Sequence, residues 1–542
     1  MKKIVLGGVF CYIFINFISS SLYADSWAKT FGGTGDDYGA YIQQTTDKGY
    51  IMTGNTASFG AGQEDFLVVK LDSTANILWA KTFGGGFMDK AFSVQQTTDG
   101  GYIVAGGTKS YGAGNSDFLL IKLTSTGAIS WSKTYGGTSI DGANAIQQTS
   151  DGGYIVLGYS FSYPSVASGG EFLVIKLDAT GNVSWAKTLG GGDLEIGTNG
   201  VQETSDGGFI VDGFTVSYGS GGEDFLVVKL TSTGAVSWTR VLGGAQDDEA
   251  NAIEQTSDGG YVVAGITNSY GVGQGDVMLS KLTSGGAVSW VKTYGGAALD
   301  CPWYIQQDGS NNYILVGETK SYGAGNSDFL VMKLDVSGSV LWSKAFGGAQ
   351  NDCANGVRLT ADGGCIIAGE TVSFGAGNYD FLMLKVNSAG GMAPDCPWVD
   401  APVTVNTPGI TGTSISTGAI CTPSNSSPSV STGTPALQTA DVCSEAGIED
   451  VVKPVKTELV CFPNPVKNTT VIRYSVASEY KTGQILIQDE AGRVVKTFEP
   501  LKRNGIVSWD AKNSKGVKVS AGTYFCVLKS ERTEVKKLIV VK

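Results

Sequence analysis

The sequence predicts an all-β protein: a seven-bladed β-propeller, then a linker, then a small β-sandwich. Three observations lead to this fold class. A tryptophan recurs every 52 to 54 residues, four short apolar segments fall within each period, and 78 of the 542 residues are glycine. So much glycine suits short strands joined by tight turns and would destabilise long helices.

The tryptophan repeat marks seven tandem units. In the second unit we expect strands at residues 79–83, 91–97, 102–106 and 118–123. Four short strands in ~50 residues is the size of one propeller blade, and so constant a period indicates a repeat architecture. The recurring residues are Trp27, Trp79, Trp131, Trp185, Trp238, Trp290 and Trp342.

Glycine-rich turns separate the expected strands. Between the second and third strands most units carry Asp-Gly-Gly, which is typical of a tight hairpin because such turns need residues with positive φ. The sixth unit has Ser310-Asn311-Asn312 instead, and Asn tolerates the left-handed conformation. The strands are apolar at most positions, which indicates sheets covered on both faces by neighbouring blades.

The phase of the repeat predicts how the ring closes. The first unit begins with a tryptophan strand at 27–31, whereas the seventh ends at 381–386 without a clear eighth tryptophan strand. Pairing these two segments would complete the last blade and remove the open sheet edges. A weaker strand near 391–398 is the competing candidate for that place.

The motif order of each unit resembles the SBBP-type bacterial β-propeller repeats. The shared motifs are G-G-x(3)-D, D-G-G-Y-I-V-x-G-x-T and D-F-L-V-x-K-L-D-x-x-G, and they extend over residues 26–391 of a propeller domain placed at 25–391. The resemblance implies the architecture and little about activity.

The N-terminus has the pattern of a signal peptide at residues 1–24. Lys2 and Lys3 precede an apolar run at 4–18, and Leu22-Tyr23-Ala24 is a plausible cleavage site. The run is too short to favour a membrane span, so we expect no transmembrane segment and a soluble exported protein. The net charge of −12 argues against nucleic acid and anionic membranes as partners.

Eight cysteines follow the expected cleavage site, all in the C-terminal half of the chain. An even number in an exported protein permits disulfides. Proximity suggests Cys461 with Cys526 and Cys421 with Cys443, and buried free thiols are the alternative.

Beyond the repeats, residues 392–456 are rich in Ser, Thr and Pro, which is a linker composition. Residues 457–542 return to short alternating strands. Phe462-Pro463-Asn464-Pro465, Val507-Ser508-Trp509-Asp510 and Ala521-Gly522-Thr523-Tyr524 resemble the type IX secretion C-terminal sorting domain. That resemblance implies an immunoglobulin-like β-sandwich recognised by an outer-membrane translocon; a hook-cap type immunoglobulin-like domain is the alternative.

The chain contains no histidine. This excludes Ser-His-Asp triads, His-assisted cysteine nucleophiles and His-ligated zinc. No G-x(4)-G-K-[ST] phosphate loop is present either. We therefore expect no enzyme and, apart from calcium, no cofactor.

Two acidic positions recur in every unit, one after the Gly-Gly pair and one before the fourth strand. Both sets should lie at one end of the propeller, where loop N–H groups would bind the carboxylates. The alternative is Ca²⁺ held by paired carboxylates and loop carbonyls. The candidate calcium ligands are Asp37, Asp65, Asp89, Asp117, Asp141, Asp248, Asp276, Asp300, Asp328, Asp352 and Asp380, and Glu171, Glu195 and Asp224 complete the two rings.

The same end should carry a ring of aromatic residues, in loops of the type Ser-[Phe/Tyr]-Gly. Aromatic rings beside carboxylates suit a sugar, since a ring stacks on a pyranose while the acids accept its hydroxyls. Packing between blades is the alternative role. These candidate binding residues are Phe59, Tyr111, Tyr163, Tyr218, Tyr270, Tyr322 and Phe374.

A Gln-Gln doublet, or a close variant, recurs on the segment expected to be the innermost strand, from Gln43-Gln44 to Gln306-Gln307. It becomes Arg358-Leu359 in the seventh unit. One residue of each doublet should face the central channel, and we favour structural hydrogen bonding over a ligand site.

These observations lead to one functional hypothesis and two alternatives. We expect a secreted or outer cell-surface protein that binds a glycan or a protein without catalysis, with the secretion machinery as partner of residues 457–542. A polysaccharide-degrading enzyme using carboxylates is the first alternative, and a structural envelope scaffold is the second. The acids repeat nearly evenly, which favours binding over a single catalytic centre.

Overall fold

The computed structural model describes residues 26–163, 169–392, 398–400, 404–406, 419–420, 424–426, 431–433, 438–444, 458–462, 470–475, 483–501, 504–529 and 534–541. The expected signal peptide lies outside them. The chain divides into two compact units, residues 1–446 and 447–542. Within the described part of the chain, no helix is long and apolar enough to cross a membrane.

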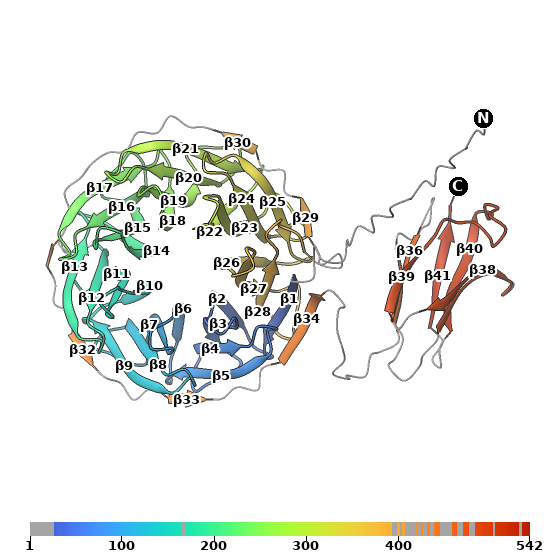
Figure 1. The fold of residues 1–542 in the computed structure, drawn as a ribbon, viewed down its shortest axis with the longest axis horizontal. Coiled ribbons are helices and arrows are strands. Elements are labelled where there is room, and N and C mark those ends of the chain that lie inside the picture. Colours follow the sequence, from blue (N-terminus) through green and yellow to red (C-terminus); the bar gives the residue numbers. More distant parts are fainter. Residues whose placement is uncertain are drawn as a thin grey trace, which may run out of the picture. The chain divides into compact units, whose positions relative to one another are not determined.

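The first unit consists of seven antiparallel blades around a central axis (Figure 1), which confirms the predicted propeller. The strand that begins each blade lies innermost, as expected for the strand with the glutamine doublet. From the axis outward, blade 1 is β2 (Asp37–Gln44), β3 (Tyr50–Thr56), β4 (Asp65–Leu71) and β5 (Ile77–Gly84); blade 2 is β6 (Asp89–Gln96), β7 (Tyr102–Thr108), β8 (Asp117–Leu123) and β9 (Ile129–Gly136); blade 3 is β10 (Asp141–Gln148), β11 (Tyr154–Ser160), β12 (Glu171–Leu177) and β13 (Val183–Leu189); blade 4 is β14 (Glu195–Glu203), β15 (Phe209–Thr215), β16 (Asp224–Leu230) and β17 (Val236–Leu242); blade 5 is β18 (Asp248–Gln255), β19 (Tyr261–Thr267), β20 (Asp276–Leu282) and β21 (Val288–Gly295); blade 6 is β22 (Asp300–Gln307), β23 (Tyr313–Thr319), β24 (Asp328–Leu334) and β25 (Val340–Phe346); and blade 7 is β26 (Asp352–Leu359), β27 (Cys365–Thr371), β28 (Asp380–Val386) and β1 (Trp27–Gly32).

The ring closes through the N-terminal strand. β1 pairs antiparallel with β28, with Trp27 opposite Lys385 and Phe31 opposite Phe381. This confirms the predicted closure. The competing candidate near 391–398 does not take that place, because β29 (Trp398–Asp400) pairs with β25 in blade 6.

In its described residues, the segment expected to be a linker contains six short strands, each of which adds a fifth, outermost strand to one blade. We call this set the belt. Its backbone groups satisfy the N–H and C=O groups that an outer edge strand leaves unpaired, and such pairing needs no particular side chains. The belt strands are β29 on β25, β30 (Thr404–Asn406) on β21, β31 (Ala419–Ile420) on β13, β32 (Ser424–Ser426) on β9, β33 (Ser431–Gly433) on β5 and β34 (Gln438–Ser444) on β1.

The hydrophobic core lies between neighbouring blades. One core cluster joins Ile51 and Phe66 of blade 1 to Ala91, Val94 and other residues of blade 2, all of them fully buried. The two middle strands of the blades are buried along nearly their whole length, as β3 and β4 illustrate. The apolar, non-alternating strands of the sequence therefore have the predicted cause.

The recurring tryptophan packs against an aromatic residue of the neighbouring blade. Trp131 of β9 meets Tyr154 of β11 edge-on, with ring centroids 5.9 Å apart, and Trp79 meets Tyr102 at 5.8 Å. Edge-to-face pairs of this kind add to the energy of burial. A contact repeated between blades fixes the spacing of the tryptophans.

The second unit contains two sheets that share one core. Leu459, Ile472 and Trp509 from the first sheet pack with Ile485 and Cys526 from the second. This is a small β-sandwich, as the sequence analysis expected for residues 457–542. The first sheet is β35 (Glu458–Phe462), β36 (Thr470–Ser475) and β39 (Asn504–Trp509), and the second is β38 (Val494–Leu501), β37 (Gly483–Asp489), β40 (Gly522–Lys529) and β41 (Glu534–Val540).

The disulfide predictions stay open. Both suggested pairs include cysteines whose side chains lie outside the described residues, namely Cys421, Cys443 and Cys461. Three cysteines of the propeller, Cys301, Cys353 and Cys365, are free thiols.

Candidate functional site: the axial channel and its mouth

The two rings of acids lie at the end of the propeller where each innermost strand begins, which we call the loop face. Their carboxylates are buried in the loops that carry them. Asp89 accepts hydrogen bonds from the Gly85 N–H at 2.8 Å and from the Ser110 hydroxyl at 2.7 Å. Asp276 accepts from the Val272 and Gly273 N–H groups at 3.0 and 2.9 Å. This is the loop-binding role that the sequence analysis favoured.

Acids of adjacent blades converge on the glycine that precedes each innermost strand. Oxygens of Asp65 and Asp89 lie 1.8 and 2.8 Å from the point that a Cβ of Gly84 would occupy. No side chain fits there, so the Gly-Gly motif is required. Burial, opposed by the loop N–H groups, raises the pKa of Asp224 to about 6. No cluster of three or more acids and cysteines able to hold a metal occurs in the described ranges, and calcium binding stays a prediction.

The predicted aromatic ring also lies on the loop face, where its tyrosines are tied to the backbone. The hydroxyl of Tyr111 donates to the Gly84 carbonyl at 2.6 Å, and that of Tyr322 donates to the Gly295 carbonyl at 2.9 Å. The rings are partly buried against the Gly-Gly loops. This geometry supports packing between blades, and the role of these residues in binding is untested.

The glutamine doublets form two rings of hydrogen bonds around the channel. The first residue of a doublet accepts from a backbone N–H of the next blade, as Gln43 does from Gln96 at 2.7 Å. The second residue accepts from a loop N–H of the preceding blade, as Gln96 does from Thr46 at 2.8 Å. Each blade is thus joined to both neighbours, which is the structural role that the sequence analysis favoured.

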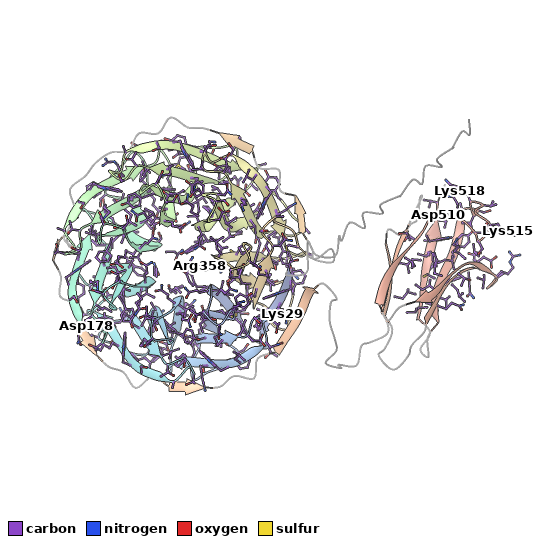
Figure 2. The ribbon with its side chains drawn as sticks, in the orientation of Figure 1. Lys29, Asp178, Arg358, Asp510, Lys515 and Lys518 are labelled. Carbon is purple, nitrogen blue, oxygen red and sulfur yellow. The ribbon has the colours of Figure 1, made fainter. Side chains whose placement is uncertain are left out.

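The seventh blade breaks both rings because its doublet is Arg358-Leu359. Arginine has no acceptor atom. The hydrogen bond that the first residue of a doublet accepts from the next blade therefore cannot form between blade 7 and blade 1. Arg358 instead projects into the channel (Figure 2). Its guanidinium lies 4.7 Å from the ring centroid of Tyr41 and 4.4 Å from that of Tyr304.

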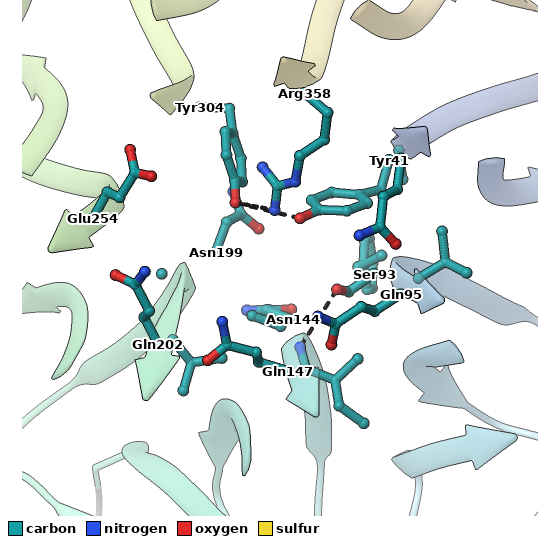
Figure 3. A pocket seen from close by; sticks show the side chains of 18 of the residues that line it. Tyr41, Ser93, Gln95, Asn144, Gln147, Asn199, Gln202, Glu254, Tyr304 and Arg358 are labelled. Carbon is teal, nitrogen blue, oxygen red and sulfur yellow. Dashed lines mark hydrogen bonds between the residues drawn. The ribbon is translucent and has the colours of Figure 1, made fainter. Parts of the chain in front are cut away.

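Arg358, Tyr41 and Tyr304 form a compact cluster on one wall of the channel (Figure 3), and we call the cavity that they line the waist. Arg358 Nη2 donates to the Tyr304 hydroxyl, and the hydroxyls of Tyr41 and Tyr304 lie 3.3 Å apart. Burial lowers the pKa of Arg358 to about 9. The waist cavity has a volume of about 200 Å³.

Two carboxyls lie near enough to Tyr304 to act on its pKa, Glu254 on the innermost strand β18 and Asp212 on β15, the second strand of blade 4. Glu254 lines the waist and accepts from the Gln307 N–H at 2.5 Å. Asp212 accepts from the Gly200 N–H at 2.9 Å. Burial raises the pKa of each to about 8, so both are largely protonated at neutral pH.

The channel widens on the loop face into a second cavity of about 410 Å³, which we call the mouth. The two cavities share several lining residues and are therefore continuous. The residues at one position of the innermost strands line the mouth and differ between blades, unlike the acids. The mouth residues at this position are Ala40, Phe92, Asn144, Asn199, Asn251, Trp303 and Asn355.

The amides of the mouth are anchored to the neighbouring blades. Asn144 Nδ2 donates to the Gly197 carbonyl at 2.7 Å, and Asn355 Nδ2 donates to the Gly39 carbonyl at 2.8 Å. Their donors are thus engaged. Phe92 and Trp303 replace the amide in blades 2 and 6, and around the ring between them lie the small Ala40 of blade 1 and Asn355 of blade 7, so one sector of the mouth is flanked by two aromatic residues.

Sequence reasoning found the channel-facing position of Arg358 but not the residues that make the site. Tyr41, Phe92, Trp303 and Tyr304 were not singled out. The signal that would have found them is variation within a repeat: where the units agree the residue holds the blades together, and where they differ it faces the channel.

The C-terminal unit matches a known family. Residues 460–542 match the secretion system C-terminal sorting domain, the Por type. This segment is a type IX secretion sorting domain. It makes the chain a secreted or cell-surface protein with the type IX machinery as a partner. No curated protein matches the chain.

Several solved structures are similar to the chain at low identity. One is PorZ, a surface component of the type IX secretion system of Porphyromonas gingivalis: 13% identity, TM-score 0.38, covering 94% of this chain and 60% of that one. A Dyadobacter fermentans protein of unknown function has 10% identity, TM-score 0.36, and coverage of 66% and 98%. The polysaccharide lyase Uly1 has 12% identity, TM-score 0.39, and coverage of 66% and 90%. Likenesses this weak say nothing about what the propeller binds.

Proposed function

We propose that the protein is a secreted or cell-surface binding protein without catalytic activity, and that its propeller holds a glycan at the mouth of the axial channel. The sorting domain supports the secreted or cell-surface location, and the mouth is the proposed glycan-binding site. The aromatic ring predicted on the loop face is tied to the backbone, so this proposal moves the glycan from those loops to the channel.

The observation that carries the proposal is the asymmetric sector of the mouth. A concave site with aromatic walls and a few fixed polar groups suits a small polar ligand. Phe92 and Trp303 offer apolar faces for the sugar ring, and the Asn144 amide presents an oxygen whose orientation its Nδ2 hydrogen bond fixes. A seven-fold ring of identical groups would have no such preferred orientation.

The test compares two phenylalanines of the same blade region. Phe92 lines the mouth, whereas Phe87 lies in the loop before β6 and is 59% exposed. On a glycan array, the full secreted chain should bind a defined set of glycans. Phe92→Ala should lose that signal and Phe87→Ala should keep it. An array without signal for the unsubstituted protein would contradict the proposal.

A polysaccharide-degrading enzyme is the second candidate, and one observation favours it. Glu370 lines the mouth, and burial together with the neighbouring charge of Glu318 raises its pKa to about 7. A carboxyl that titrates near neutral pH suits a general acid. Release of reducing ends from bound glycan, lost in Glu370→Gln, would support this candidate over simple binding.

A further inference from the structure

The waist differs from the mouth in its hydrogen-bonding character. The Oε1 of each glutamine that begins a doublet accepts a hydrogen bond from a backbone N–H of the next blade. The distance is 2.5 Å for Gln95 and 2.6 Å for Gln147 and Gln202. Their Nε2 groups remain as donors beside the cavity that these residues line. The waist is therefore rich in donors and poor in acceptors.

Arg358 supplies a positive charge to this ring of donors. Its Nη1 donates to the Val357 carbonyl at 3.0 Å and its Nη2 to the Tyr304 hydroxyl. The remaining N–H groups have no acceptor among the described residues, and no described acid lies within ion-pair distance. The stacked tyrosines hold the guanidinium plane, which leaves its edge available for a planar anion.

The other charged residue that lines the waist is Glu254, and it does not neutralise Arg358. One oxygen of its carboxyl group accepts a hydrogen bond from the Gln307 N–H at 2.5 Å, and Figure 3 shows the Glu254 side chain apart from the Arg358 cluster. Its raised pKa makes it a further donor at neutral pH. Arg358 is half-buried; a cation partly withdrawn from water without a counter-ion is costly, and a bound anion offsets that cost.

We propose that the waist is a binding site for a carboxylate, and that the glycan of the proposed function carries one, as a uronic acid does. The carboxylate lies against the edge of Arg358 and among the glutamine Nε2 groups, and the sugar ring extends into the mouth. One guanidinium matches one negative charge, and planar carboxylates fit its fork of N–H groups. This inference rests on the proposed function and adds the substrate class.

Arginine at position 358 costs the propeller one hydrogen bond between blades. A role in stabilising the fold would not explain that loss. Glutamine at this position would accept from the backbone N–H of Gln44 and complete the ring, as the first residue of the doublet does in the other six blades. Blade 7 gives up this link for a cation. Natural proteins depart from an otherwise consistent sequence pattern in this way at functional sites.

Calorimetric titration with methyl β-glucuronide and methyl β-glucoside, which differ at the carboxylate, tests the proposal on the full secreted chain. The glucuronide should bind at least about tenfold more tightly, as one charge-assisted contact implies. Arg358→Gln should remove this preference and leave the glucoside unaffected. Arg240→Gln is the matched control, because Arg240 also lies over an aromatic ring, 5.7 Å from that of Trp238, but on the outermost strand of blade 4.

The outcomes separate the two proposals. Equal affinity for both sugars, or a preference retained in Arg358→Gln, would overturn the carboxylate site while the glycan-binding mouth stands. Binding of neither sugar would overturn both. The melting temperature of Arg358→Gln gives an independent reading, and we expect it to rise because the seventh link forms; a fall would mean that arginine serves the fold.

Discussion

The ammonium of Lys122 lies 2.8 Å from the carboxylate of Asp99 and also donates to the Leu123 carbonyl at 3.1 Å. Lys122 is in β8 and almost fully buried, whereas Asp99 is in the Asp-Gly-Gly turn between β6 and β7. The pair ties the hairpin to the next strand. Each of the seven blades has this lock: Lys70–Asp47, Lys122–Asp99, Lys176–Asp151, Lys229–Asp206, Lys281–Asp258, Lys333–Asp308 and Lys385–Asp362.

We expect Asp99→Asn to destabilise the propeller by about 1–3 kcal/mol, since a buried ammonium loses its charged partner. Chemical unfolding of the substituted and unsubstituted protein measures this. Asp193→Asn is the control, because Asp193 is exposed and has no such lysine. Equal unfolding midpoints for Asp99→Asn and the unsubstituted protein would show that the lock contributes nothing.

The pH dependence of stability should have a maximum in mildly acidic solution. Burial alone would raise the pKa of Asp99, Asp151, Asp206 and Asp258, but hydrogen bonds from the lysine, a threonine and a glycine N–H lower it to about 2. Their contribution is present above the ordinary pKa and is lost as the pH falls from about 4 to 2.

The carboxyl group of Asp224 changes the stability with pH in the opposite direction to these four aspartates. Its pKa is raised to about 6, so its protonated form favours the fold, and this contribution is lost as the pH rises from about 4 to 6. Melting temperatures between pH 2 and 8 should therefore rise slightly from pH 7 to 5 and fall steeply below 4. Asp224→Asn should reduce the rise. A melting temperature that only increases toward pH 8 would contradict this reading.

Ring closure can be tested with two equivalent phenylalanines. Phe31 of β1 and Phe83 of β5 are both fully buried on the fourth strand of a blade, but only β1 comes from the other end of the propeller sequence. Each substitution by alanine should cost about 3–5 kcal/mol. Only Phe31→Ala should release the N-terminal strand to limited proteolysis. Cleavage at the same sites in both variants would argue against closure by β1.

Export depends on the sorting domain. We expect deletion of residues 457–542 to leave the propeller in the periplasm, because it removes the segment that matches a secretion system C-terminal sorting domain. Cell fractionation and surface labelling detect this. A deletion of the same length from the repeats is unsuitable as a control, so a full chain carrying Phe87→Ala serves instead. Surface delivery of the truncated chain would refute the assignment.

The features that recur in every blade could be predicted from the sequence, whereas the features that occur once could not. Strand number, blade order and closure through 27–31 follow from one period, because the same contacts recur in every blade. The belt was missed since backbone pairing of β29–β34 leaves no side-chain pattern. The waist was missed because Tyr41, Tyr304 and Arg358 belong to different blades. Their clustering at the channel cannot be recognised from the sequence of any one repeat.

The pairing of β1 with β28 has a kinetic consequence. Trp27 and Lys385 are opposite each other, so the last blade is incomplete until nearly the whole propeller sequence is available. Contacts of such large sequence separation slow folding, because the cost of closing the loop comes before the contacts form. A chain carried through a membrane from its N-terminus would hold an unpaired β1 throughout that passage. Completion of the ring is then a final event, and the partly built disc is the species that a chaperone would meet.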